Sequence, residues 1–263
     1  MILKGKKGLI FGALNDQSIA WQVAEQCVAE GAEIVLTNAP VAFRLGTVKT
    51  LSTQLNSPLI AADATKVEDL EQLVAQTMAH FGGKFDFVLH SIGMSLNIRK
   101  NKPYTDLDYG YMQQSFDISA ISFHKLMKVL YEKDALNEWG SILALTYIGA
   151  QRAFPHYHEM SEAKALLESF ARSFGYHFGK DKKIRVNTIS QSPTATTAGT
   201  GITGFDKFLE HSAKMSPLGN APALDCAKYC ISLFSDYTRY VTMQNLFHDG
   251  GFSTTGMSLE FME

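Results

Sequence analysis

The chain has 263 residues, of which 46% are hydrophobic and 19% charged, with a formal net charge of -2. This composition is typical of a globular protein and supplies enough apolar side chains for a large core. The near-neutral charge argues against nucleic acid as the main partner, because nucleic-acid binding usually requires a concentrated basic face.

Short apolar runs alternate with longer helical patterns along the chain. Most of the runs are continuously apolar, which is typical of strands buried on both faces of a parallel sheet. In chain order, strands are predicted at 8–11, 33–37, 59–63, 85–91, 141–146, 184–190 and 243–249. Helices are predicted at 18–30, 41–55, 66–81, 110–133, 160–178 and 221–234. This order predicts one α/β domain over residues 1–263, a doubly wound parallel sheet of about seven strands with helices on both faces.

The segment 191–214 breaks this alternation. It is rich in Ser, Thr and Gly, with only a short helical pattern after Phe205. It follows the sixth predicted strand, at the carboxyl edge where open α/β sheets bind ligands. Long irregular segments in such places are often functional. We therefore predict a substrate-binding lid over about residues 194–214, which we call the lid segment.

The cysteine content and the absence of long apolar runs indicate the compartment. Cys27, Cys226 and Cys230 are too few and too widely spaced for a disulfide framework, and no neighbouring His or Cys completes a metal site. The N-terminal residues lack the apolar stretch of a signal peptide, and no run is long enough to span a membrane. We expect a cytoplasmic protein with reduced, buried thiols, no bound metal and no membrane partner.

The first predicted strand runs into a turn that begins at Gly12 and leads to Ser18-Ile19-Ala20. A dinucleotide-binding fold places the pyrophosphate here, at the N-terminus of the following helix. The usual G-x-G-x-x-G pattern is missing, and only Gly12 remains. Ser18 is predicted as a helix cap and a phosphate donor.

Residues that follow the second, third and fourth predicted strands are candidates for binding the adenosine and the riboses of a dinucleotide. The run Thr37-Asn38-Ala39-Pro40 has no carboxylate of the kind that binds the adenosine ribose in NAD-preferring folds. Arg44 is close enough in sequence to bind a 2′-phosphate, so the sequence leaves NADPH open as the cofactor. Asp63 is predicted either to accept a hydrogen bond from the adenine amino group or to cap its strand. Gly93, in His90-Ser91-Ile92-Gly93, would let the backbone approach a ribose closely.

The segment from Ser141 to Leu167 holds two tyrosines and a lysine that are candidates for catalysis. A strand ends at Tyr147, and Lys164 follows Tyr157 by seven residues. Seven residues fall about 20° short of two helical turns, so Tyr157 and Lys164 would share a helix face if Tyr157 lies within the helix. A phenol and an ammonium there could stabilise an oxyanion and hold a sugar hydroxyl.

The chain resembles the type I enoyl-acyl carrier protein reductases, a divergent branch of the short-chain dehydrogenase superfamily. The matching motifs occur in the family's order and spacing from about Gly5 to Phe252. They are Gly12 with Ser18-Ile19-Ala20, His90-Ser91-Ile92-Gly93, Tyr147, Tyr157 with Lys164, Arg185-Val186-Asn187, Pro193-Thr194 and His248-Asp249-Gly250-Gly251-Phe252.

This resemblance implies a homotetrameric Rossmann-fold enzyme that reduces the trans-2 double bond of enoyl thioesters on acyl carrier protein in bacterial fatty-acid synthesis. Hydride would pass from NADH to the substrate β-carbon and leave an enolate. Tyr157 would donate a hydrogen bond to the enolate oxygen, and Lys164 would hold the nicotinamide ribose. Tyr147, the third catalytic candidate, would line the acyl pocket with Tyr157, and Ser95 would lie near the substrate carbonyl.

The resemblance also implies a cofactor-binding set drawn from several loops. Its members are Gly12, Ser18, Ile19, Asp63, Ala64, Ile92, Lys164, Thr194, Ala195, Thr196, Thr197 and Ala198. The uncharged Asn38-Ala39 fits NADH, whereas Arg44 leaves NADPH open.

Two segments depart from the family pattern. Ser192 replaces a glycine beside the expected nicotinamide site. The lid helix, which begins near Phe205, has fewer basic residues than is usual for docking an acidic carrier protein. Carrier recognition would then fall to Lys207, Lys214 or the Arg99–Lys102 cluster, or else these are solvated charges.

Two other functions stay open at this point. A ketoreductase of the same superfamily would use Tyr-x-x-x-Lys, but Ser161 follows Tyr157 by four residues and Met160 precedes Lys164 by four. A dinucleotide-binding regulator without turnover would not need the combination of Tyr147, Tyr157 and Lys164.

Overall fold

The computed structural model describes residues 1–197, 199–202 and 204–259, which build a single seven-stranded sheet. The strands are β1 (Lys7–Phe11), β2 (Glu33–Asn38), β3 (Leu59–Ala61), β4 (Phe85–His90), β5 (Leu136–Thr146), β6 (Arg185–Gln191) and β7 (Asn245–His248). Their order is β3-β2-β1-β4-β5-β6-β7, and every neighbouring pair is parallel. The predicted parallel sheet is confirmed.

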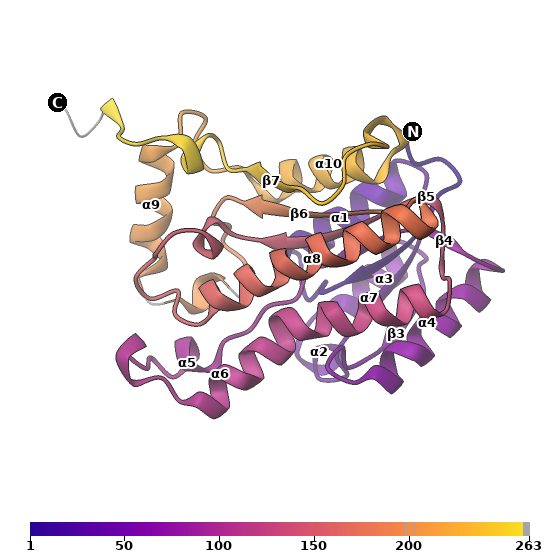
Figure 1. Ribbon diagram of the computed structural model, residues 1–263, viewed down its shortest axis with the longest axis horizontal. Helices are drawn as coiled ribbons and strands as arrows, with labels where there is room; N and C mark the ends of the chain where they lie inside the picture. The colour runs from indigo at the N-terminus through magenta and orange to yellow at the C-terminus, as the bar shows by residue number, and fades with distance from the viewer. Residues whose placement is uncertain (198, 203, 260–263) are drawn as a thin grey trace.

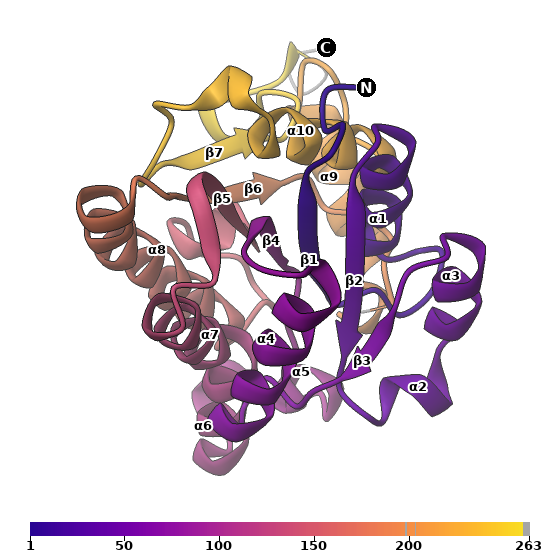
Figure 2. The same cartoon turned by 90° about the vertical axis from the view of Figure 1, so that its right-hand side faces the viewer.

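Helices cover both faces of the sheet, as Figures 1 and 2 show. One face carries α4, α7 and α8, and the other carries α1, α3 and α10. The helices are α1 (Ile19–Ala29), α2 (Ala42–Leu45), α3 (Val48–Gln54), α4 (Val67–Phe81), α5 (Leu96–Arg99), α6 (Tyr109–Phe116), α7 (Ser122–Glu132), α8 (Met160–Lys182), α9 (Phe205–Met215) and α10 (Ala223–Phe234). None of the described helices is both long and apolar enough to cross a membrane.

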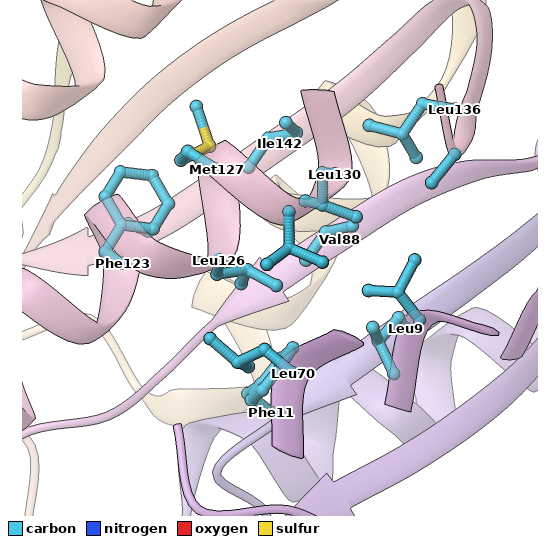
Figure 3. Close-up of a cluster of buried hydrophobic side chains, with 14 of the residues drawn as sticks. Leu9, Phe11, Leu70, Val88, Phe123, Leu126, Met127, Leu130, Leu136 and Ile142 are labelled. Carbon is cyan, nitrogen blue, oxygen red and sulfur yellow. The ribbon is translucent and has the colours of Figure 1, made fainter. Parts of the chain in front are cut away.

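The apolar strands supply the centre of two cores, one on each face. In the core between the sheet and α4, α7 and α8, the side chains of Leu126 and Leu130 lie beside Val88 of β4 (Figure 3). These three side chains are fully buried. Burial of each such side chain contributes about 1.5–3 kcal/mol relative to exposure, so continuous apolar strands need helices on both sides.

The single helix predicted over 41–55 is wrong, because the chain forms α2 and α3 with a break at Gly46. A Cβ on Gly46 would lie 2.3 Å from the Leu14 carbonyl oxygen, and the Thr47 amide donates to that same oxygen at 2.9 Å. The break therefore lets the backbone contact the turn after β1. This contact joins residues about thirty positions apart, and the pattern of apolar residues along a predicted helix carries no information about such a contact.

Other boundaries differ from the predictions. The helix predicted over 110–133 is interrupted by a π-helical turn at Asp117–Ile121, between α6 and α7. β5 begins at Leu136, five residues early, and β3 ends at Ala61, so Asp63 lies beyond the strand. A short helix, α5, also occupies the loop after β4, where none was predicted.

All strands end at the same edge of the sheet. There, the loops after β1, β4, β5 and β6 lie beside α5, the start of α6 and α9, at the left of Figure 1. The lid segment follows β6 and includes α9 except for its last residue, Met215.

Candidate active site

A cavity of about 460 Å³ opens at the carboxyl edge of the sheet. It lies where the strand order reverses between β1 and β4, which is the usual ligand site of open α/β sheets. The sequence-predicted residues that line it are Gly12, Ser18, Ile19, Ile92, Ser95, Tyr147, Tyr157, Lys164, Thr194, Thr196 and Thr197. Asp63, Ala64 and Ala195 are not among its lining residues, and Ala198 lies outside the described residues.

Gly12 forms the closest contact between the loops after β1 and β4. Its φ of +95° is favourable only for glycine, and a Cβ there would lie 1.9 Å from the Ser91 carbonyl oxygen. No other residue fits without moving one of the two loops. The single glycine that remains of the usual motif is therefore required by the backbone itself.

The predicted helix-capping role of Ser18 is wrong. Ser18 occupies the N-cap position of α1, but its hydroxyl makes no cap hydrogen bond. Instead, its Oγ accepts from the amides of Leu14 at 3.1 Å and Asn15 at 3.2 Å. The Ser18 hydroxyl in turn donates to the Asn15 carbonyl, so the side chain folds the turn before α1. Its role as a phosphate donor stays a prediction, as does an anion at this helix N-terminus.

The residues expected near the adenosine are divided between the cavity and the surface. Asn38 lines the cavity, and its amide donates to the Ala13 carbonyl at 2.9 Å. Arg44 is exposed on α2 and does not line the cavity. Asp63 accepts from the amide and the hydroxyl of Thr65 at 3.0 and 2.7 Å, which agrees with the alternative that it caps its strand. Its contact with an adenine stays a prediction.

Tyr147, Tyr157 and Lys164 come together at the cavity wall. The rings of the two tyrosines lie 5.2 Å apart between centroids. Burial raises the pKa of each phenol well above its ordinary value, so both stay protonated and can donate a hydrogen bond. The Tyr147 hydroxyl is buried, with no hydrogen-bond partner among the described residues.

Tyr157 does not lie within the helix that carries Lys164, so the shared helix face was the wrong basis for pairing them. α8 begins at Met160, and Tyr157 belongs to the loop before it. His156 and His158, on either side, adopt φ values of +66° and +48°. These left-handed residues bend the loop so that Tyr157 reaches the cavity.

Lys164 is a buried lysine, only 8% exposed, whose Nζ donates to the Leu145 carbonyl at 2.8 Å. A Cβ on Gly93 would lie 3.7 Å from this Nζ, so the ammonium stands beside the loop after β4. Burial lowers the pKa of Lys164 to about 8, and the nearby Glu168 acts in the opposite direction. The side chain therefore carries its charge at neutral pH, close to its titration range.

Glu168 was not predicted, although it lies one turn after Lys164. It is 4% exposed and links three segments through its carboxylate. Its oxygens accept from Thr146 of β5 at 2.9 Å, from Asn245 of β7 at 3.1 Å and from Gln151 at 3.2 Å. An i,i+4 Glu on a lysine-bearing helix is the only sequence signal, and it is common on ordinary helices.

The lid segment covers the tyrosines. Phe208 of α9 packs against Tyr147 with ring centroids 5.7 Å apart and against Phe154 at 5.3 Å. At its other end, Thr197 accepts a hydrogen bond from the Asn15 side-chain amide at 2.9 Å. The lid segment therefore contacts both the catalytic candidates and the turn after β1.

The structure shows what surrounds the two segments that depart from the family pattern. Ser192 is 4% exposed, and its Oγ accepts from the Ala221 amide at 3.0 Å. This hydroxyl ties the loop after β6 to the start of α10, where a glycine could not. Among the basic candidates, Arg99 lines the cavity and is exposed, whereas Lys214 pairs with Glu210 at 2.7 Å.

The π-helical turn also serves the site. π turns are rare and often occur at functional positions. Here, the Ser119 hydroxyl accepts from the Met94 amide at 3.0 Å and lies 3.1 Å from the Met94 carbonyl oxygen. The turn thereby fixes the loop after β4, which forms one wall of the cavity.

Comparison with known proteins identifies the family. A family model described as Enoyl-(Acyl carrier protein) reductase matches residues 12–253. The chain belongs to this family. It is 35% identical over 258 residues to Enoyl-[acyl-carrier-protein] reductase [NADH] 2 of Rhizobium meliloti, and the match covers 97% of this chain and 94% of that protein.

Solved structures of enoyl-acyl carrier protein reductases share the fold. The FabI–NADH complex from Alistipes finegoldii is 63% identical, with a TM-score of 0.97, and the match covers 98% of this chain and 91% of that one. The Bacillus cereus enoyl-acyl carrier protein reductase with NADP⁺ and an indole naphthyridinone is 28% identical, with a TM-score of 0.90, covering 97% and 99%. The resemblance stated from the sequence is confirmed.

Proposed function

We propose that this protein is an NADH-dependent enoyl-acyl carrier protein reductase, which reduces the trans-2 double bond of enoyl thioesters in bacterial fatty-acid elongation. The observation that carries the proposal is the placement of Tyr157 and Lys164 on one cavity at the strand-order reversal, in a chain of this family. The relatives named for NADH support the choice of cofactor.

The residues present fit a nicotinamide dinucleotide. The Gly12 turn and the N-terminus of α1, which has no side-chain cap, suit a pyrophosphate. Asn38 lines the cavity where an adenosine ribose would lie, while Arg44, the candidate for a 2′-phosphate, does not. Lys164 presents a charged amine beside Gly93, which suits ribose hydroxyls. This arrangement favours NADH over NADPH.

NADH, when bound, would supply the hydride that reaches the substrate β-carbon, and a proton from solvent would then add to the α-carbon of the enolate to give the saturated thioester. Tyr157 donates a hydrogen bond to the thioester carbonyl, where negative charge develops as the enolate forms. Because its pKa is raised, the phenol keeps its proton for this role. A donor aimed at developing charge contributes more than one that binds the ground state equally.

Lys164 holds the sugar of the cofactor and adds positive potential to the same side of the cavity. The Leu145 carbonyl fixes its Nζ, and Glu168 keeps a compensating negative charge one turn away. Tyr147 forms the wall against which the acyl chain lies. Its contacts with Phe154 and Phe208 keep water away from the enolate.

Acyl carrier protein is the proposed carrier, and a homotetramer is the proposed assembly. Arg99, which is exposed and lines the cavity, suits an acidic partner at the mouth of the site. Exposed apolar side chains such as Leu218 and Tyr240, at 88% and 89%, support burial between subunits. The free, buried Cys27, Cys226 and Cys230 support a reducing, cytoplasmic location.

A direct test compares crotonyl and acetoacetyl thioesters with NADH and with NADPH. We expect NADH oxidation with the crotonyl thioester and a lower rate with NADPH. Turnover of only the acetoacetyl thioester would establish a ketoreductase instead. Binding of NADH without its oxidation by any enoyl thioester would favour a dinucleotide-binding regulator.

A further inference from the structure

Glu159 is a fully buried carboxylate that the proposed reaction does not use. It has no exposed surface, immediately precedes α8 and follows Tyr157 by two residues. One of its oxygens, Oε1, accepts three hydrogen bonds. The donors are the Ser95 hydroxyl at 2.6 Å, the Ser115 hydroxyl at 2.9 Å and the Asn97 side-chain amide at 3.2 Å.

These three donors come from α5, its N-cap and α6, and Ser95 is the one of the three that lines the cavity. Ser95 lines the cavity and caps α5, where its oxygen also accepts from the Ile98 amide at 3.0 Å. Asn97 exchanges two hydrogen bonds with the backbone of Asp108, which begins α6. Glu159 therefore joins α5 and α6 to the loop that presents Tyr157.

The same geometry determines what Ser95 can do. Its hydroxyl proton is directed at Glu159, so it is not free to donate to a substrate carbonyl in this arrangement. The expected role of Ser95 beside the substrate stays a prediction. What the contacts support is a role in holding the cavity wall.

The second oxygen of Glu159, Oε2, is buried with no hydrogen-bond partner among the described residues, so this carboxylate is costly to bury. An apolar side chain of similar size would fill the space without that cost. The carboxylate differs from such a side chain in one respect, because the three hydrogen bonds to its Oε1 link two segments. Those segments carry Tyr157 on one side and Ser95 on the other.

We propose that Glu159 is a positioning residue, whose carboxylate sets the placement of Tyr157 against the Ser95 wall of the cavity. This inference rests on the proposed function. Small displacements of a reacting group reduce rate strongly. The hydrogen bonds of the Glu159 side chain go to α5, its N-cap and α6, whereas the Nζ of Lys164 is held by the Leu145 carbonyl. The expected signature is a loss in kcat that leaves NADH affinity intact.

The test uses Glu159→Leu, Glu159→Gln and Ser115→Ala in the full-length protein, with crotonyl thioester and NADH. Glutamine keeps one acceptor oxygen, whereas leucine removes the acceptor. Glu162→Leu is the matched control, because Glu162 lies three residues further on, in the first turn of α8, and its carboxylate accepts from the exposed Tyr104 hydroxyl. Ser115→Ala removes one donor only, so it tests the same contact if Glu159→Leu does not fold.

We expect kcat to fall about tenfold in Glu159→Leu, and less in Ser115→Ala, while Glu159→Gln recovers most of the rate. The NADH dissociation constant, measured by fluorescence titration, should match that of the wild type in all of them.

Equal kcat values in Glu159→Leu and Glu162→Leu would overturn the inference. A parallel loss of rate and NADH affinity would also overturn it, as would a glutamine variant no better than the leucine variant. If the wild type itself reduces no enoyl thioester, the proposed function fails and this inference fails with it.

Discussion

Tyr147 and Tyr157 meet edge to face, with their ring centroids 5.2 Å apart and their planes inclined by 68°. The two phenols are thereby held at one end of the cavity but in different surroundings. Tyr147 packs among Phe154 and Phe208, and its hydroxyl has no hydrogen-bond partner in the described chain. Tyr157 packs against this aromatic group and also against the apolar group of Ile98, Met160 and Ala163, so the two tyrosines should respond differently to loss of the hydroxyl.

Replacing Tyr157 with Phe should reduce kcat by about a hundredfold, because one hydrogen bond to the developing enolate is lost. NADH affinity should stay nearly unchanged, since the phenol acts on the thioester. Steady-state kinetics with crotonyl thioester and a fluorescence titration with NADH separate the two quantities. Tyr147→Phe, which keeps the ring contacts, is the control, and we expect a smaller loss from it. A larger loss of kcat in Tyr147→Phe would mean that Tyr147, and not Tyr157, donates the hydrogen bond to the enolate.

Lys164→Ala should weaken NADH binding as well as rate, because the ammonium is assigned to the cofactor ribose. The comparison with Tyr157→Phe is decisive when both variants are titrated with NADH under the same conditions. If the two variants lose NADH affinity equally, the division of labour between phenol and ammonium is wrong.

NADH affinity should fall as the pH rises through about 8, the pKa to which burial lowers Lys164. Below this pH the ammonium is charged and affinity should be constant; above it the neutral amine loses its positive potential. Titrations between about pH 7 and about pH 9 would measure the change. Lys164→Arg provides the control, because a guanidinium keeps its charge over that range. A wild-type affinity that does not change with pH would exclude Lys164 as the titrating group.

Gly12→Ala should destabilise the protein and abolish NADH binding, since the added Cβ would lie 1.9 Å from the Ser91 carbonyl oxygen. Gly82→Ala is the matched control: its φ of +69° is also left-handed, but nothing lies within 4 Å of a Cβ there. The control should cost about 1–2 kcal/mol of unfolding free energy from backbone strain alone. Urea unfolding of both variants isolates the contribution of the contact, and similar losses in both would show that the two loops can separate.

Acid should destabilise the protein through His90. Burial, with a smaller effect of Lys164, lowers the pKa of His90 to about 3 in the folded protein, whereas the ordinary value is 6.5. Between these values the unfolded chain binds a proton that the folded protein does not. The free energy of unfolding should therefore fall on acidification below about pH 6.5, by up to about 1.4 kcal/mol per pH unit.

Urea unfolding at a series of pH values measures this slope. His90→Gln should flatten it, whereas His80→Gln should not, because His80 is exposed on α4. An unchanged slope in His90→Gln would mean that other groups dominate the acid response.

The parallel sheet could be predicted because each strand is a continuous apolar run, and burial on both faces leaves few alternatives. The break at Gly46, the π turn beside Met94 and the buried Glu159 could not be predicted. Each depends on a contact between segments far apart in sequence: Gly46 with Leu14, Ser119 with Met94, and Glu159 with Ser95. The tyrosines and Lys164 were found through their resemblance to a family motif, while the loop conformation that presents Tyr157 required the structure.

The hydrogen bond from Asn15 to Thr197 joins the turn after β1 to the lid segment across the exposed mouth of the cavity. A single hydrogen bond of this kind contributes about 1 kcal/mol, which corresponds to about a fivefold preference for the joined state. The contact of Phe208 with Tyr147 belongs to α9, further along the same segment. The contacts that the lid segment makes beside the Gly12 turn and those that it makes over the tyrosines are therefore different, and each can be altered by mutation without touching the other.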